Sequence, residues 1–380
     1  MNPKTQISTA YQQAYQRLNA RQKEAVDHIY GPLMVIAGPG TGKTQLLAVR
    51  IGRILETTDF GPENILCLTF TNAGVDAMRK RLESFIGKDA RKIGIYTFHA
   101  FCNEVIQDHP EYFNMVEWQP ISELEKYEWM EEIISRLASD HPLYRGKGDQ
   151  FVDVDSLISL NRIMKQEGWT KDMVQKEIDD YLEEIKSGKV DEFVYKRDTR
   201  NGKKGDLKWD KIGELEERFT RTKAALDVIE QYNKLLKEKK RYDYEDMINW
   251  VIDLFQNHQG LLSDYWERYQ FILVDEYQDT NGAQNELLKL LTDYDQPNVM
   301  VVGDDDQAIY RFQGASIGNM KSFADRFSGS GLKVVVLEEN YRSTQDILDV
   351  ANQLIANNQN RLVQYLQERF QLSKQLFAHV

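Results

Sequence analysis

Cysteine and long apolar runs are what this chain has least of. Two of its 380 residues are cysteine, Cys67 and Cys102. Cys67 lies in an apolar strand pattern and Cys102 on an expected helix, so we interpret both as buried thiols rather than a disulfide or a metal site. No apolar run approaches the roughly 20 residues of a membrane-spanning helix, and the N-terminus has no apolar signal core. These absences predict a cytoplasmic protein without a membrane partner.

Positive charge is also in deficit, with a formal net charge of −12. An acidic balance argues weakly against a nucleic-acid partner, although a local basic groove can lie on an acidic body. One basic cluster interleaved with glycine spans residues 196–208. Two interpretations of it remain open, a mobile basic loop that contacts phosphates and a solvated hairpin tip.

Glycine is concentrated in one informative segment, which follows an apolar run at 33–36 and precedes a helical pattern at 45–51. The segment reads Ala37-Gly38-Pro39-Gly40-Thr41-Gly42-Lys43-Thr44. A strand, a glycine-rich turn and a helix form the context of a phosphate-binding loop, in which backbone N–H groups and the helix N-terminus face an anion. Lys43 supplies charge to the β- and γ-phosphates, and the Thr44 hydroxyl can bind Mg²⁺. Ala37 stands where this motif usually begins with glycine.

Two adjacent carboxylates follow a second apolar run, at 271–274. They are Asp275 and Glu276, and the carboxyl end of a buried parallel strand is where α/β sheets bind ligands. We expect Asp275 to hold Mg²⁺ through water and Glu276 to deprotonate an attacking water. An acidic turn that caps the next helix is the alternative. A kinase needs no water-activating glutamate, so Glu276 favours hydrolysis over a metabolic kinase.

Several segments, in order along the chain, resemble motifs of the UvrD/Rep/PcrA branch of superfamily-one DNA helicases. They are 18–26 (the adenine-reading motif), 37–44 (the phosphate loop), 68–72 and 96–102 (early DNA-contact motifs), 242–248 (an acidic segment), 302–315 (the coupling motif) and 337–344 (the start of the second motor domain). The resemblance implies ATP and Mg²⁺ as cofactors. It also implies single-stranded DNA and duplex junctions as partners, together with repair or replication proteins of unspecified identity.

The same resemblance implies roles for single residues. Gln22 contacts adenine, Tyr341 stacks on the base, and Gln307 and Arg342 reach the γ-phosphate. The DNA contacts are Phe70, Asn72, Thr97, His99, Arg311 and Phe312. Apart from the resemblance, Gln22 reads as an exposed helix residue and His99 as a hydrogen-bonded core histidine.

Periodicity and resemblance together predict an α/β fold, a RecA-like parallel sheet flanked by helices. Residues 1–16 form a polar lead-in, 17–100 and 241–330 the first RecA-like ATP-binding domain, 101–240 an inserted helical subdomain, and 331–380 the incomplete start of a second RecA-like domain. Strands are expected at 33–37, 65–70, 93–97, 271–275, 299–304 and 333–338, and helical patterns at 345–357 and 361–380.

The resulting functional hypothesis is the front half of an ATP-dependent 3′-to-5′ DNA helicase. The alternative is a truncated, non-motor fragment that binds ATP or single-stranded DNA without unwinding, because the family's later motifs, including an arginine that completes the ATP site, do not follow Arg342. An arginine finger is worth about 10³–10⁵ in rate in related enzymes. We therefore expect ATP binding to survive and rapid, DNA-coupled hydrolysis to fail.

Overall fold

A computed structural model describes residues 7–113, 117–146, 148–308, 317–358, 361–370 and 372–379. Its main feature is a parallel six-stranded sheet of order β3-β2-β6-β7-β1-β8. The strands are β1 (Leu33–Ala37), β2 (Ile65–Thr69), β3 (Gly94–Thr97), β6 (Phe271–Val274), β7 (Asn298–Gly303) and β8 (Lys333–Leu337). The α/β class expected from the sequence is confirmed, and the six strands lie within one residue of their expected positions at either end.

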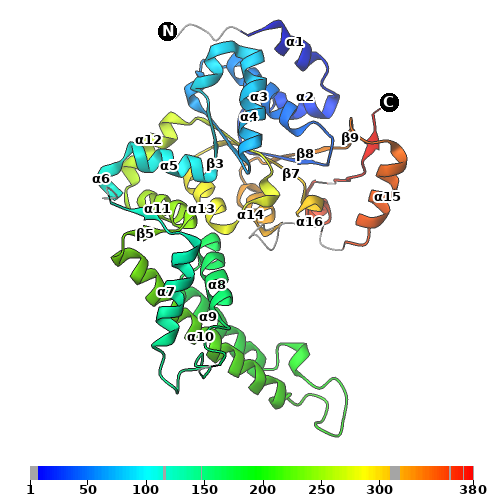
Figure 1. Cartoon of the computed structure of the whole chain (residues 1–380). Coiled ribbons are helices and arrows are strands. Elements are labelled where there is room, and N and C mark those ends of the chain that lie inside the picture. Colours follow the sequence, from blue (N-terminus) through cyan, green and yellow to red (C-terminus); the bar gives the residue numbers. More distant parts are fainter. Residues whose placement is uncertain are drawn as a thin grey trace. The chain divides into compact units, whose positions relative to one another are not determined.

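Both faces of this sheet are buried, which explains why its strands read as continuous apolar runs. Leu33 and Val35 of β1 belong to a core with α1 (Thr9–Gln16), α2 (Ala20–Asp27), α3 (Lys43–Thr57) and α4 (Asn72–Ile86). Met34 and Ile36 alternate with them, are equally buried, and face the other way. Figure 1 shows α1–α4 on one side of the sheet and α5, α11, α13 and α14 on the other.

The remaining helices around the sheet connect or follow its strands. They are α5 (Phe98–Asp108), α6 (Pro110–Phe113), α11 (Tyr244–Asn257), α12 (Gln259–Arg268), α13 (Gly282–Leu291), α14 (Ile317–Phe327), α15 (Gln345–Ile355) and α16 (Leu362–Phe370). Two short strands, β9 (Glu339–Asn340) and β10 (Phe377–Ala378), pair in parallel. The expected helical pattern at 361–380 therefore holds for α16 alone among the described residues, because 372–376 form no helix or strand and 377–378 form β10.

The chain divides into two compact units, Met1–Phe113 with Met247–Val380, and Asn114–Asp246. The boundary expected at 330/331 differs from the structure. Strand β8 pairs with β1 from Leu33↔Lys333 to Ala37↔Leu337 and so completes the first sheet. An apolar strand has the same local pattern in either sheet, so its partner is decided by tertiary pairing.

The N-terminal segment also differs from the loose lead-in expected for residues 1–16. Residues 9–16 form α1, capped by the Ser8 hydroxyl, which accepts a hydrogen bond from the Tyr11 N–H. The Tyr11 ring is fully buried beside Gly52 and Phe85, and its hydroxyl donates to Glu56. One large buried aromatic ring thus docks an otherwise polar helix.

The unit Asn114–Asp246 is mainly helical and has its own apolar core. Its helices are α7 (Glu123–Ser135), α8 (Val154–Glu167), α9 (Lys171–Lys186) and α10 (Trp209–Glu238), with β4 (Gln119–Pro120) paired to β5 (Arg241–Tyr242). Buried Asp243 pairs with Lys165 at 2.9 Å and with Lys126 at 3.1 Å. Burial alone would raise the pKa of Asp243, but the two ammonium groups hold it below its ordinary value.

Three simpler expectations can be compared with the structure. Cys67 and Cys102 are buried free thiols, as expected. Across the described ranges, none of the helices has both the length and the apolar character that crossing a bilayer requires. The basic cluster lies on a hairpin with antiparallel bridges Val194↔Leu207 and Thr199↔Gly202, and a phosphate-binding role for it stays a prediction.

The contact between α1 and α3 can be tested at Gly52. A Cβ there would lie 2.4 Å from the Tyr11 ring, closer than carbon atoms approach. We expect Gly52→Ala to lower the free energy of unfolding by about 1–3 kcal/mol, because the ring must move. Urea unfolding followed by circular dichroism measures this. The control is Gly260→Ala in α12, where a Cβ meets no described atom within 4 Å and the change should stay within about 0.5 kcal/mol. Equal stability of the two variants would contradict the docking of α1.

Candidate functional site

The phosphate loop lies between the carboxyl end of β1 and the start of α3, so it connects a central strand directly to a helix. Gly40 and Gly42 have φ angles of +72° and +85°, in the left-handed region that glycine adopts without strain. Gly42 is the N-cap of α3, and Lys43 and Thr44 are its first two residues. Within the described part of the chain, no side chain caps this helix.

Hydrogen bonds hold the four successive loop carbonyls of residues 38–41. The Thr41 hydroxyl donates to the Gly38 carbonyl at 2.8 Å, and the Gln22 amide donates to the Thr41 carbonyl at 3.0 Å. From residues distant in sequence, the Asn340 amide donates to the Pro39 carbonyl at 2.5 Å, and the Tyr341 N–H donates to the Gly40 carbonyl at 2.9 Å. Since the carbonyls are satisfied, the uncapped N–H groups at the start of α3 and its positive dipole end are what the loop offers a ligand.

Glu276 is the counter-charge of Lys43. The Lys43 ammonium lies 2.5 Å from the Glu276 Oε2. Glu276 has a φ of +51°, an uncommon conformation for a residue with a side chain, and it directs the chain away from the end of β6. The Asp275 N–H donates to the Leu68 carbonyl at 2.9 Å, which extends the pairing of β6 with β2. The two carboxylates therefore begin at the sheet edge, as the sequence predicted.

Asp275 lacks a direct cationic partner in the described part of the chain. Burial raises the pKa of Asp275 to about 6, the Glu276 carboxylate adds to the rise, and Lys43 opposes it. The pKa of Asp279 is raised to about 6 by the same two causes. Buried carboxylates with raised pKa values lack positive charge. A hard divalent cation such as Mg²⁺ would supply that charge, and the Thr44 hydroxyl at the start of α3 is a second oxygen ligand of the right chemistry.

Gln278 joins the end of β6 to the end of β7. Its amide donates to the Glu276 Oε2 at 2.9 Å, and its Oε1 accepts from the Asp304 N–H at 3.0 Å. Gln307 lies three residues after Asp304, and its side-chain amide donates to the Asp304 carboxylate at 2.5 Å. Gln307, the candidate γ-phosphate sensor, is thus connected to Glu276, the candidate base, through Asp304 and Gln278.

Residues after β8 reach the phosphate loop from the other side. Asn340 Oδ1 accepts from the N–H groups of Arg342 and Ser343, at 2.8 and 2.7 Å, so one amide shapes this turn and binds the loop. Arg342 lies beside Gly40, its Cβ 2.8 Å from where a Cβ of Gly40 would stand. The Tyr341 hydroxyl accepts from the Asn19 amide at 3.0 Å. Tyr341 and Arg342 are therefore brought to the loop, as expected for residues that serve the nucleotide.

Gln22 is buried and part of a capping box at the start of α2. Its Oε1 accepts from the Asn19 N–H at 3.1 Å while its amide holds Thr41. The interpretation of Gln22 as an exposed helix residue is therefore wrong. Its adenine contact stays a prediction, and its position next to the phosphate loop suits that role.

The candidate DNA residues that the structure describes also lie at the carboxyl edge of the sheet, but at the ends of β2 and β3. Phe70 follows β2 and Asn72 begins α4, while Thr97 ends β3 and His99 lies in the first turn of α5. Strands β2 and β3 pair in parallel with Thr69 opposite Thr97, so these segments are neighbours. Phe70, Thr97 and His99 are partly exposed, and Asn72 is exposed. Arg311 and Phe312 lie outside the described residues.

Two residues of the site were missed by sequence analysis. Asn340 stands inside the segment 337–344 and Gln278 two residues after Glu276, but their hydrogen bonds join positions 301 and 26 residues apart. A buried amide among carboxylates or against a glycine loop is the signal that could have singled them out, because such amides are retained for their hydrogen bonds.

Comparison with known proteins gives a consistent result. A protein-family model described as the UvrD/REP helicase N-terminal domain matches residues 18–328. The chain is 31% identical over 344 residues to the ATP-dependent DNA helicase PcrA of Staphylococcus epidermidis, and 33% identical over 345 residues to that of Bacillus subtilis. Each alignment covers 90% of this chain and 40% of the relative, so the chain spans about two fifths of the relatives' length. These matches confirm the resemblance carried by the motifs.

The raised pKa of Asp275 predicts how stability depends on pH. The folded-state value of about 6 exceeds the ordinary 3.8, so the stabilisation from protonation is complete below about 4 and lost as the pH rises through 6. In EDTA at pH 8, Asp275→Asn should raise the free energy of unfolding by up to about 3 kcal/mol, with about half that gain at pH 5. Asparagine still accepts from the Glu276 N–H.

Urea unfolding at several pH values measures this gain, with exposed Asp264→Asn on α12 as the control. A gain for Asp275→Asn that does not change between pH 8 and pH 5 would show that charge burial is not its cause.

Proposed function

Because the chain belongs to the UvrD/Rep helicase family, we propose that it binds Mg²⁺-ATP at the carboxyl edge of its sheet and hydrolyses it slowly on its own, and that rapid hydrolysis coupled to single-stranded DNA belongs to the complete protein. One observation carries this proposal. The N-terminus of α3 has no side-chain cap, and Lys43 beside it forms an ion pair with Glu276. Among the described residues, no other carboxylate lies within ion-pair distance of Lys43. This arrangement provides both an anion site and a base next to it.

The roles in hydrolysis follow from these contacts. ATP phosphates take over Lys43 as their counter-charge, which frees the Glu276 carboxylate to accept a proton from the attacking water. Gln278 keeps its hydrogen bond to Glu276 and so limits the directions in which that carboxylate can turn. When bound, Mg²⁺ would offset the negative charge that develops on the phosphates, with Thr44 and Asp275 as its protein ligands.

Four further residues serve the nucleotide in this proposal. Gln22 exchanges its hydrogen bonds for the adenine edge, since a side-chain amide offers both a donor and an acceptor. Tyr341 is 44% exposed and presents its ring to the base. Gln307 and Arg342 contact the γ-phosphate, one from the β7 end and one from the turn beside Gly40.

We infer that single-stranded DNA lies along the ends of β2 and β3. Phe70, Asn72, Thr97 and His99 would contact it there, together with Arg311 and Phe312, whose assignment rests on the family motif. An aromatic face suits a single strand, because every base can stack on it. Asp275, directly after β6, donates its N–H to the Leu68 carbonyl of β2, so the nucleotide and DNA segments adjoin at neighbouring strands.

For the complete protein we propose ATP-dependent unwinding of DNA with 3′-to-5′ polarity, action at duplex junctions, and cytoplasmic work with repair or replication proteins. The relatives are named ATP-dependent DNA helicases, and the chain spans two fifths of their length. Strand displacement by this chain alone would require it to translocate. If ATP and single strands bind but no strand is displaced, the chain acts as a nucleotide- and DNA-binding part of the motor.

Lys43 and Glu276 should separate binding from chemistry. We expect Lys43→Ala to abolish most ATP affinity, because the phosphates lose their charge partner. Glu276→Gln should retain or increase the affinity, because it removes the carboxylate that competes for Lys43, while hydrolysis falls by roughly 10²–10⁴. Calorimetry and a phosphate-release assay with single-stranded DNA measure the two quantities.

The matched controls are Lys289→Ala and Glu286→Gln, which break an exposed ion pair of 3.2 Å on α13. Both should behave as the wild type does. Equal ATP affinity in Lys43→Ala and wild type would refute the assignment of the phosphate loop. Undiminished hydrolysis in Glu276→Gln would show that another residue is the base.

Phe70 tests the DNA edge. Phe70→Ala should weaken the binding of an oligothymidylate by about 1–3 kcal/mol, the contribution of one stacked base. The slope of log affinity against log salt should be about 0.7 per phosphate contact and unchanged in this variant, because no charge is removed. Tyr30→Ala is the control, since Tyr30 is 60% exposed at the opposite, amino edge of the sheet. Fluorescence anisotropy showing the same loss in both variants would refute this location.

A further inference from the structure

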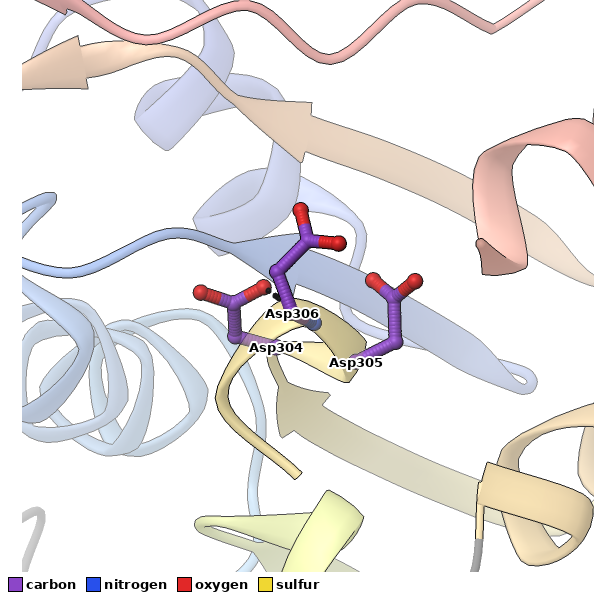
Figure 2. A group of neighbouring side chains, drawn as sticks. All are labelled: Asp304, Asp305 and Asp306. Carbon is purple, nitrogen blue, oxygen red and sulfur yellow. Dashed lines mark hydrogen bonds between the residues drawn. The ribbon is translucent and has the colours of Figure 1, made fainter. Parts of the chain in front are cut away.

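A buried ion cluster lies at the end of β7, beside the candidate nucleotide site. The Lys374 side chain is 2% exposed, and its ammonium contacts Asp304, Asp305 at 3.1 Å and Asp306 at 2.7 Å. Arg361 binds Asp306 through two nitrogens, at 3.0 and 2.7 Å. Figure 2 shows the three carboxylates extending to the same side of the turn after β7. They come from the coupling segment, whereas both cations come from beyond residue 360.

The three carboxylate groups are close enough together to hold a metal ion. Lys374 and Arg361 occupy their oxygens instead, and the Asp304 carboxylate also accepts from Gln307. The cluster is therefore an internal ion network. Burial alone would lower the pKa of Lys374, but the three aspartates raise it, so the lysine stays charged.

Lys374 is not what attaches its own segment to the unit. The Leu362 N–H donates to the Asp305 carboxylate at 2.6 Å, and Arg361 binds Asp306. Further along, Leu376 packs against Gly38, and β10 pairs with β9. These contacts hold the segment without Lys374. What Lys374 adds is a positive charge beside Asp304, whose side chain has no exposed surface.

Asp304 is where the cluster meets the site. Its carboxylate accepts from Lys374 and from Gln307, and its N–H donates to Gln278. Gln278 donates to Glu276, which pairs with Lys43. Lys374 is thus linked to the phosphate loop by hydrogen bonds that meet at Asp304, whose carboxylate binds Lys374 and whose backbone N–H binds Gln278. Without the ammonium, the fully buried Asp304 carboxylate would lose its nearest counter-charge, so its position would no longer be stabilised by an ion pair.

We propose that Lys374 is a positioning residue for ATP hydrolysis, which holds the Asp304 carboxylate in place so that Gln307 and, through Gln278, Glu276 keep their orientation. This role rests on the proposed ATPase function, and it assigns to a lysine after α16 a part in the chemistry at β6 and β7. Lys374 contacts neither nucleotide nor water in this scheme, so its removal should affect turnover more than binding.

The first test does not depend on activity. We expect Lys374→Met to increase hydrogen–deuterium exchange in a peptide covering 300–308, with no change in the peptides of β2 and β3. Lys374→Arg should restore protection, because it keeps the charge. Lys333→Met is the control, since it removes a partly exposed ion pair with Glu24. Unchanged exchange at 300–308 in Lys374→Met would overturn the proposal.

The second test separates positioning from stability. The kcat of Lys374→Met should fall by about 10–100-fold, with KM and ATP affinity within about threefold of wild type. In a Gln307→Ala background the same change should cost little more, because the two residues act through one contact. Full additivity of the two losses would overturn the proposal. If Lys374→Met does not fold, Lys374→Met/Asp305→Asn removes one charge of each sign, keeps an acceptor for Leu362, and should show the same fall in kcat.

Failure of the proposed function would look different. A wild-type chain that binds no ATP would refute the ATPase assignment, whereas the exchange experiment would still decide whether Lys374 fixes the turn after β7. Normal ATP binding and hydrolysis in Lys374→Met, together with wild-type exchange, would leave the function standing and overturn the role of Lys374.

Discussion

The orientation of the phosphate loop is the constraint on which the rest of the site depends. Its carbonyls accept hydrogen bonds from Thr41 within the loop, Gln22 before it, and Asn340 and Tyr341 three hundred residues later. Because the carbonyls are tied in this way, the loop and the start of α3 can present N–H groups to an anion. The contacts also explain why α2 and the turn after β8 are packed against the loop.

The carboxylates at the sheet edge differ in whether the protein itself supplies cations beside them. Lys374 and Arg361 lie directly against the Asp304–Asp306 cluster and offset two of its three negative charges within the protein. Asp275 and Asp279 are buried without such partners in the described part of the chain, and their raised pKa values express that deficit. A metal ion bound here would bring positive charge to Asp275, and the phosphates bound with it would replace Glu276 as the partner of Lys43.

The sheet order explains how two functions share one edge. Strands β1, β6 and β7 carry the nucleotide residues, while β2 and β3 carry the candidate DNA residues. Strand β6 lies between β2 and β7, so Asp275 is joined to β2 by its backbone and to the β7 turn through Gln278. A movement of that turn would therefore change the surroundings of the candidate base Glu276 and of the adjacent candidate DNA edge.

By itself, the sequence determined the strands of the sheet, the phosphate loop, the acidic strand end and the family, because each is written in a local pattern of apolar runs, glycines or adjacent carboxylates. Only the tertiary structure decided that β8 completes the first sheet, that Tyr11 docks α1 on Gly52, and that Gln278 and Lys374 serve the turn after β7. Those features are contacts between residues far apart in the chain, and a local pattern is the same whichever distant partner it meets.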